Sequence, residues 1–395
     1  MEMHKKYVTV LLLTAFSLLA RAQQSESSVI SAVENNSPEL KAARALLDAQ
    51  IGETRTGNSL PDPEVGYNHM WGTSVAAGES DEFTASQGFD FPTAYIHRSK
   101  AAKSKAAGYR AQYDARRMET VLRAKLLIRE IAYLQAQVSL QRQRYDDAMH
   151  AARLAVKRAE AGQITSIEEN KIRMQTISAE NALQRSRMAL KTARIQLSVL
   201  SGGFFPQDGT VTPDPLPQLP SLEAALQRAM EQDPSLTASR ADITTALSEK
   251  KLATSMALPK FNAGYKYSNS DGLKFNGVTA GMSIPIFQSR GTVKLARARM
   301  AESESNMENI RTAVTADIAA KHAQATALEE MEKAYGKDTA TAERAELLKK
   351  ALDAGQISIL EYFVELETVY RNMEEYNEIS YDYSVLNIQL NKYDF

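Results

Sequence analysis

Residues 161–168 read AGQITSIE, and residues 354–361 read AGQISILE. The same spacing separates Phe91-Pro92 from Ile284-Pro285. Three looser matches, 196 to 198 residues apart, lie earlier in the chain and occur in the same order in both halves: residues 35–40 with 231–236, 60–61 with 258–259, and 65–67 with 263–265. Similarity at a constant distance is the sequence signature of a repeated structural unit. The sequence therefore predicts an internal duplication.

Each copy has the same expected order of elements: a lead-in helix, two strands, a long helix, a glycine turn and a shorter return helix. The first copy covers residues 23–203, with a lead-in helix over about 27–56, a hairpin over about 62–91, a long helix over about 94–161 and a tip turn over 161–166. The second copy covers residues 221–395, with the corresponding elements at about 221–256, 259–286, 291–354 and 354–358. A proline-rich linker over 204–220 joins the copies, and its prolines exclude a helix.

The strand segments alternate apolar and polar residues. Val65, Tyr67, His69 and Trp71 alternate with Glu64, Gly66, Asn68 and Met70, and the other three segments have a similar pattern. A period of two places each set on one face of a sheet. Segments of about nine to eleven residues are long enough to cross a bilayer when tilted. Since the smallest common membrane barrels have eight strands, four strands from one chain cannot close a barrel.

The first long helix is unusual in its length. Residues 94–161 contain no proline and one glycine, Gly108, and a continuous helix of that length would span about 100 Å. Leu127, Ile131 and Leu134 recur at coiled-coil spacing. The sequence therefore predicts long helices that pack along one another, in a helical tube or in a rod.

The N-terminus has the features of an export signal. Residues 1–22 combine basic residues, an apolar run and the small-residue pattern Ala20-Arg21-Ala22, which predicts a signal peptide and Gln23 as the first mature residue. A retained membrane anchor is the alternative. The absence of cysteine excludes disulfides and thiolate metal sites. The 47 basic and 48 acidic residues nearly cancel, so bulk charge indicates neither nucleic acid nor an anionic lipid surface.

No catalytic motif is present in the sequence. The five histidines are scattered, with no pair at metal-binding helical spacing. The glycines at 202 and 203 follow an expected helix and do not lie between a strand and a helix, as a phosphate-binding loop requires. We therefore expect no enzyme activity, no cofactor and no metal site.

The export signal, the duplicated helix–hairpin–helix plan and the paired Ala-Gly-Gln-Ile turns together resemble the TolC-like outer-membrane efflux proteins, also called outer membrane factors. The resemblance implies a mainly α-helical protein with a membrane β part. It implies a homotrimer whose 12-stranded β-barrel lies in the outer membrane of a diderm bacterium and continues as a long periplasmic α-helical barrel. The implied function is the passive exit channel of a tripartite efflux or type I secretion system.

The resemblance also implies partners and site residues. The partners are a periplasmic adaptor (a membrane fusion protein), an inner-membrane pump such as an RND or ABC transporter, and outer-membrane lipid, without nucleic acid. The residues implied to contact the adaptor at the tips are Gly162, Gln163, Ile164, Thr165, Gly355, Gln356, Ile357 and Ser358. Ile164 and Ile357 are expected to be exposed apolar knobs.

Two glutamates are the candidate gate residues. The resemblance implies that Glu361 rings the tunnel entrance and that Glu168 occupies the matching position in the first turn. Ile357 and Val364 stand where the family can carry polar residues, so the family's polar lock is not reproduced here. A soluble periplasmic coiled-coil scaffold or adaptor is the alternative function. Drugs, metal ions and polypeptides all remain open as cargo.

Overall fold

The computed structural model describes residues 24–73, 78–285, 289–335 and 341–395. The expected signal peptide, residues 1–22, lies outside these residues. The chain divides into two compact units. Unit 1 comprises Met1–Ala42, Arg116–Ala229 and Thr315–Phe395, and unit 2 comprises Ala43–Ala115 and Met230–Val314.

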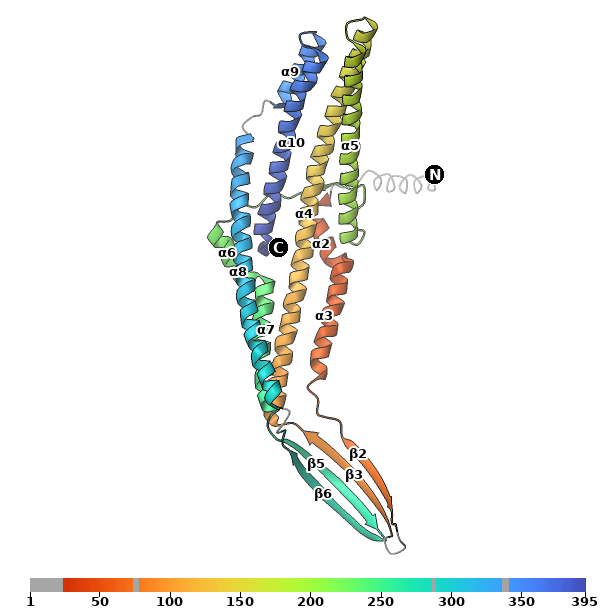
Figure 1. Cartoon of the computed structure of the whole chain (residues 1–395), viewed down its shortest axis with the longest axis vertical. Coiled ribbons are helices and arrows are strands. Elements are labelled where there is room, and N and C mark those ends of the chain that lie inside the picture. Colours follow the sequence, from red (N-terminus) through yellow and green to blue (C-terminus); the bar gives the residue numbers. More distant parts are fainter. Residues whose placement is uncertain (1–23, 74–77, 286–288, 336–340) are drawn as a thin grey trace, which may run out of the picture. The chain divides into compact units, whose positions relative to one another are not determined.

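Each half of the chain contains the same order of elements, as the duplication predicts (Figure 1). The first half contains α2 (Glu26–Asn36), α3 (Pro38–Thr56), β2 (Glu64–Trp71), β3 (Glu79–Phe89), α4 (Pro92–Glu160) and α5 (Ser166–Leu200). The second half contains α6 (Leu222–Gln232), α7 (Pro234–Ser255), β5 (Lys260–Ser270), β6 (Leu273–Ser283), α8 (Ser289–Tyr335), α9 (Thr341–Asp353) and α10 (Ile359–Leu390). Two short strands, β1 (Gln24–Ser25) and β4 (Val211–Thr212), pair in parallel, and a short 3-10 helix, η2 (Lys392–Asp394), follows α10.

The lead-in helices differ from the prediction of one unbroken helix each. Both divide immediately before a proline, at Ser37 and at Asp233. Proline lacks the backbone N–H that an interior helical position donates, but it fits the first position of a new helix. Asp233 caps that new helix by accepting a hydrogen bond from the Ser235 N–H at 2.9 Å.

The long helices agree with the sequence to different extents. Helix α4 is continuous over 69 residues. In the second copy, α8 ends at Tyr335 and α9 begins at Thr341, and residues 336–340 lie outside the described residues. The prediction of one helix over 291–354 is therefore not tested at that point. Among the described residues, no helix combines the length and the apolarity needed to cross a membrane.

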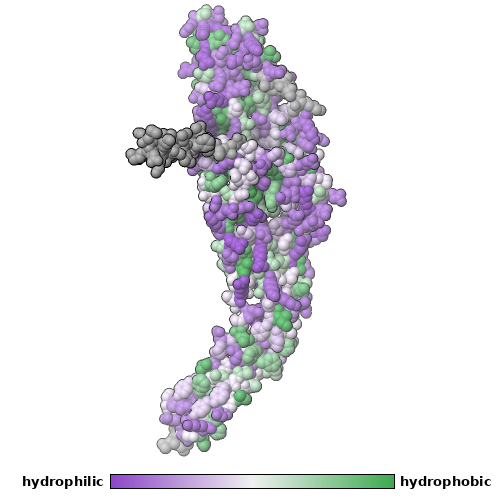
Figure 2. Space-filling view, turned by 180° about the vertical axis from the view of Figure 1, so that it is seen from behind, coloured by the Kyte–Doolittle hydropathy of each residue, from purple (hydrophilic) through white to green (hydrophobic). Residues whose placement is uncertain are grey.

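The four long strands form one antiparallel sheet in the order β2-β3-β5-β6. The central β3–β5 pair joins the two copies. The register places Tyr67, Phe83 and Tyr267 in one row on one face, and the next row places Thr84 opposite Lys266 on the other face. On β6 the Tyr67 row ends at Asn276, whereas the neighbouring row on the same face is apolar on all four strands: Val65, Ala85, Tyr265 and Val278. In Figure 2 hydrophobic and hydrophilic residues lie next to one another on the sheet. Strands β2 and β6 are the edges.

In unit 1, a buried carboxylate ties the start of the described chain to the linker. Glu26 is 1% exposed and accepts hydrogen bonds from Lys125 Nζ at 3.0 Å and from the Asp214 N–H at 2.8 Å. Arg129 Nη2 lies 3.5 Å from the second Glu26 oxygen and also donates to the Asp214 carbonyl. Because the carboxylate holds groups from α4 and from the linker together, it fixes the path of the linker across the helices.

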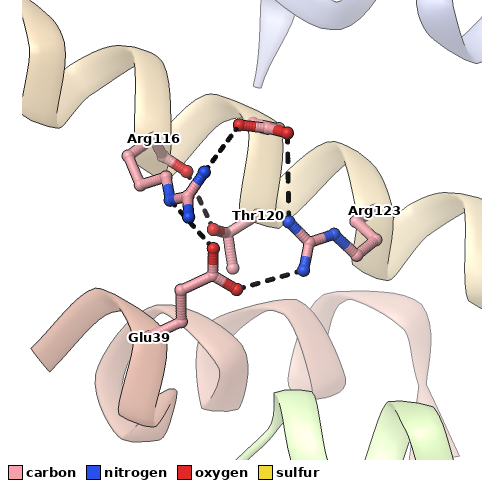
Figure 3. A network of polar contacts seen from close by, with 5 residues as sticks. Glu39, Arg116, Thr120 and Arg123 are labelled. Atoms are coloured by element: carbon pink, nitrogen blue, oxygen red, sulfur yellow. Dashed lines mark hydrogen bonds and ion pairs between the residues drawn. The ribbon is translucent and has the colours of Figure 1, made fainter. Parts of the chain in front are cut away.

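A second polar network holds the start of α3 against α4 (Figure 3). Both carboxylate oxygens of Glu39 are used: Arg116 Nε lies 2.9 Å from one, and Arg123 Nη1 lies 3.1 Å from the other. Glu119 contacts the same two arginines, at 3.3 Å and 4.0 Å. These side chains are partly exposed, so each pair stabilises the fold only weakly, but together they define the register between the two helices.

Candidate functional site at the paired helix turns

The two glycine turns have the same backbone geometry. Gly162 and Gly355 have φ values of 70° and 71°, in the left-handed region that glycine adopts without strain. After α4, the Gln163 N–H donates to the Arg158 carbonyl at 2.8 Å, and the Gly162 N–H donates to Ala159 at 2.9 Å. This pair of hydrogen bonds is the Schellman motif, which satisfies the last carbonyls of a helix.

The second turn repeats this motif after α9. The Gln356 N–H donates to the Ala351 carbonyl at 2.9 Å, and the Gly355 N–H donates to Leu352 at 3.1 Å. Gln163 and Gln356 are exposed, one at each turn. The repeated sequence therefore corresponds to a repeated backbone structure that exposes one glutamine side chain at each turn.

Both return helices begin with a capping box. The Thr165 N–H donates to Glu168 Oε2 at 2.8 Å, and the Glu168 N–H donates back to Thr165 Oγ1 at 3.3 Å. Ser358 and Glu361 form the same pair of hydrogen bonds, at 2.8 Å and 3.1 Å. Thr165 and Ser358, expected as adaptor contacts, thus also stabilise helix N-termini.

The capping boxes affect the charge of the two candidate gate residues. The backbone N–H of Thr165 lowers the pKa of Glu168, and the backbone N–H of Ser358 lowers the pKa of Glu361. Hydrogen bonds to a carboxylate favour its charged form. Both gate candidates are therefore ionised at neutral pH, while each is held against the helix that it caps.

The two isoleucines of the turns are not the exposed knobs that the sequence suggested. Ile164 and Ile357 are half-buried and pack against one shared hydrophobic cluster. Its fully buried members come from α4, α5, α9 and α10, and include Ile172, Leu352 and Tyr362. The isoleucines are covered because each one packs on a core that forms only when two helical hairpins, α4–α5 and α9–α10, pack together. The highly exposed apolar side chains beside the turns are instead Ile167, at 71%, and Val364, at 68%.

Polar contacts between these two helical hairpins accompany the hydrophobic cluster. His150 on α4 lies 2.7 Å from Asp353 at the end of α9. Arg158 Nη2 donates to the Leu352 carbonyl at 3.3 Å. These contacts connect the end of the first long helix directly to the second turn, and Figure 1 shows both turns at the same end of the helices of unit 1.

Farther along α4, a second set of contacts reaches α10. Arg144 pairs with Glu367 and lies 3.5 Å from Glu374. The Tyr370 hydroxyl donates to Asp147, and both residues are buried. Burial, together with the nearby Asp147 carboxylate, raises the pKa of Tyr370, so the hydroxyl remains a donor at neutral pH. The seam between α4 and α10 therefore combines a buried charge-assisted hydrogen bond with ion pairs.

A cavity of about 420 Å³ lies beside this seam. It is bounded by α4, α5 and α10, and its lining includes Arg144, Gln175, Phe363, Val364 and Arg371. Val364, which stands where the family can carry a second acidic ring, thus contributes an apolar wall to this cavity. The structure brings the two turns and their glutamates into one region of unit 1.

The sequence interpretation missed two features of the site. The capping boxes were recognisable, because Thr165 and Ser358 each precede a glutamate by three positions. The seam partners Asp147 and Tyr370 are 223 positions apart, and no local pattern links them.

Comparisons with known proteins agree with this architecture. The family model described as outer membrane efflux protein matches residues 29–203 and 225–394. The outer membrane protein TolC of Vibrio cholerae is 25% identical over 427 residues, covering 98% of this chain and 94% of the relative. The cobalt-zinc-cadmium resistance protein CzcC of Cupriavidus metallidurans is 25% identical over 260 residues, covering 62% of this chain and 59% of the relative.

Solved structures show the same fold. A membrane protein from Pseudomonas aeruginosa matches with a TM-score of 0.80 at 15% identity, covering 93% of this chain and 89% of that chain. The outer membrane protein VceC of Vibrio cholerae matches with a TM-score of 0.78 at 17% identity, covering 93% of this chain and 95% of that chain. The two matched segments of the family model account for most of the sequence. The chain therefore belongs to the outer membrane efflux protein family, whose members are channels of the outer membrane and not enzymes.

Proposed function

We propose that three copies of this chain form the passive exit channel of a tripartite efflux or type I secretion system. The observation that carries the proposal is the four-stranded sheet with two unpaired edges, β2 and β6. In a bilayer, each unpaired N–H or C=O group is costly, so a sheet can span the membrane only when it closes on itself. Three copies supply twelve strands in one barrel and leave no edge.

The helices of unit 1 offer a matching pair of edges for a ring. One face of α5 carries apolar side chains that are exposed in the single chain: Met174, Ile177, Met188 and Val199. One face of α8 carries small and apolar exposed residues at helical spacing: Ala316, Ala320, Ala323, Ala327, Met331 and Ala334. In Figure 1, α5 and the part of α8 that belongs to unit 1 lie on opposite sides of α4 and α10. Bulky side chains of one copy packing on the small residues of the next would continue the layer around an axis.

The paired turns are the proposed docking site for the periplasmic adaptor. Exposed Gln163 and Gln356 offer amide donors and acceptors, and Ile167 offers an apolar contact beside the first turn. The Schellman motifs and capping boxes hold these side chains on rigid backbone, which reduces the entropy lost on binding. An inner-membrane pump of the RND or ABC class would supply the energy, with the adaptor connecting it to the channel.

Glu361 is the proposed charge at the channel entrance, with Glu168 in the corresponding position of the first turn. In a trimer, three Glu361 carboxylates would surround one axis and favour cations over anions. The lowered pKa of Glu361 supports this role, because the carboxylate stays charged at neutral pH. The Glu361 side chain would then have two roles, as the charge at the channel entrance and as part of the capping box of α10.

The chain contains no cysteine, so engineered disulfides can test closure between edge strands. Asn68→Cys on β2 is combined in turn with Gly277→Cys, Thr279→Cys or Gly281→Cys on β6, all on the same face of the sheet as Asn68. Cells are oxidised, and the outer-membrane fraction is separated without reductant. We expect at least one pair to give covalent dimers and trimers that reduction dissolves.

The matched control places the first cysteine on an interior strand. Thr84→Cys lies on β3, which has neighbours on both sides within its own chain, so it should not cross-link to β6 of another copy. If every β2–β6 pair stays monomeric in the outer-membrane fraction, the proposed ring is wrong. Recovery of the unmodified chain only as a soluble periplasmic species would also contradict the channel.

A further inference from the structure

Basic residues gather where helices α4 and α8 leave the sheet. Residues 92–105 contain four basic residues and no acidic one, and residues 289–301 also contain four basic residues and no acidic one. The near-equal totals of the whole chain, 47 basic and 48 acidic, conceal this local excess. The charge distribution therefore carries information that net charge does not.

Six of the basic residues at this end are exposed and have no acidic partner among the described residues. We call them the basic collar: Lys100, Lys103, Lys251, Lys294, Arg297 and Arg299. Other basic residues nearby are already engaged, since Arg98 and Lys260 pair with Asp90, and Lys105 pairs with Glu249. Because residues 92–105 and 289–301 contain no acidic residue, the collar has a net positive charge that an external partner can neutralise.

The collar lies close to the end of the sheet. Lys294 and Lys100 are only about 8 Å and 12 Å along their helices from the first helical residue, and Arg299 is about 15 Å along. The flexible stems of lysine and arginine can carry the charge several ångströms back towards the sheet. A bilayer crossed by the sheet would therefore place its headgroups within reach of the collar.

Exposed apolar side chains are interleaved with the collar. Ile96 is 54% exposed, Leu295 is 52% exposed and Leu258 is 38% exposed. Ile96, Lys100 and Lys103 follow one another at spacings of four and three, so they share one face of α4. Basic side chains alternating with aliphatic ones are typical of surfaces that lie at a membrane interface. A site for a free anion in water would gain nothing from these exposed aliphatic residues.

We infer that the basic collar binds the anionic phospholipid headgroups of the periplasmic leaflet of the outer membrane. This inference rests on the proposed function, in which the sheet spans that membrane. The end of α3 and the approach to β2 are different, because there the exposed Arg55 is outnumbered by the acidic Glu53, Asp62 and Glu64. The lipid contact is therefore formed by α4, α7 and α8.

The test compares lipid selectivity between two triple variants. Lys294→Gln, Arg297→Gln and Arg299→Gln together remove the α8 part of the collar. The control, Arg153→Gln, Lys157→Gln and Arg173→Gln, removes three exposed basic residues from unit 1. Each full-length protein is reconstituted in phosphatidylcholine vesicles. Electron spin resonance then measures the association of spin-labelled phosphatidylglycerol relative to spin-labelled phosphatidylcholine.

We expect the unmodified protein and the control to prefer phosphatidylglycerol at low salt, and the preference to fall in 1 M salt. Each collar charge removed should weaken phosphatidylglycerol binding at its own contact by about fivefold. Equal selectivity of the collar variant and the control would overturn the inference, as would no preference in the unmodified protein. In either case, the proposed channel still stands if the proteins insert in vesicles and conduct ions. If the unmodified protein and both variants fail to insert, the lipid inference and the proposed channel are both contradicted.

Discussion

Replacing Glu26 with glutamine should destabilise unit 1 strongly. The carboxylate is 1% exposed and neutralises Lys125 and Arg129, whose side chains are only 19% and 11% exposed. Removing the charge deprives Lys125 and Arg129 of the Glu26 carboxylate, and within the described part of the chain only Arg129 keeps another acidic neighbour, Asp214. Breaking a buried pair in this way costs about 3–5 kcal/mol. The amide also places an N–H group where the Asp214 N–H or a cation now donates. We expect a loss of about 3 kcal/mol or more in the free energy of unfolding.

The assay is urea unfolding in detergent, followed by circular dichroism of the helices, with Glu34→Gln as the matched control. Glu34 pairs with Arg117, but their side chains are 31% and 45% exposed, so the loss there should stay below about 1 kcal/mol. Limited proteolysis adds a local measure, because the linker around Asp214 should be cleaved faster in the Glu26 variant only. Equal shifts of the two unfolding midpoints would refute the argument that burial determines the cost.

The remaining predictions concern the turns and the seam. Gly355→Ala should cost about 1 kcal/mol in urea unfolding, because φ at this position is 71°; no loss would contradict the Schellman motif. A double-mutant cycle of Asp147→Asn and Tyr370→Phe should give a coupling of about 1–2 kcal/mol, and zero coupling would show that the hydrogen bond between them contributes nothing. Glu361→Ala should weaken divalent-cation block of single-channel current, and unchanged block would remove Glu361 from the entrance. Because the pKa of Glu361 is lowered in the folded protein, its capping contribution is present above its unfolded pKa and is lost as pH falls through the folded value. Hydrogen exchange of the Ser358 amide, corrected for its intrinsic pH dependence, should therefore show constant protection from neutral pH to about pH 5 and weaker protection only in stronger acid; a loss of protection near pH 6 would contradict this assignment.

Local sequence signals predicted much of the fold. Glycine after a helix and proline before one act on their immediate neighbours, so the turns at Gly162 and Gly355 were recognisable. The alternation in the strands was recognisable for the same reason. The break before Pro38 was missed only because the lead-in segment was interpreted as one helix, although the proline itself was the signal.

Features that depend on contacts between distant segments could not be predicted. The partners of Glu26 lie 99, 103 and 188 positions away in sequence. Ile164 and Ile357 were wrongly expected to be exposed, because the cluster that covers them exists only when both hairpins pack together. The β3–β5 pairing that joins the two copies into one sheet is likewise a tertiary contact.

The central claim is that the open edges β2 and β6 close between copies of this chain. Electron cryo-microscopy of the protein extracted from the outer membrane tests it most directly. We predict three copies around one axis, with β2 of each copy hydrogen-bonded in antiparallel register to β6 of the next. A single chain with both edges unpaired, or a closed ring of two copies, would contradict the account.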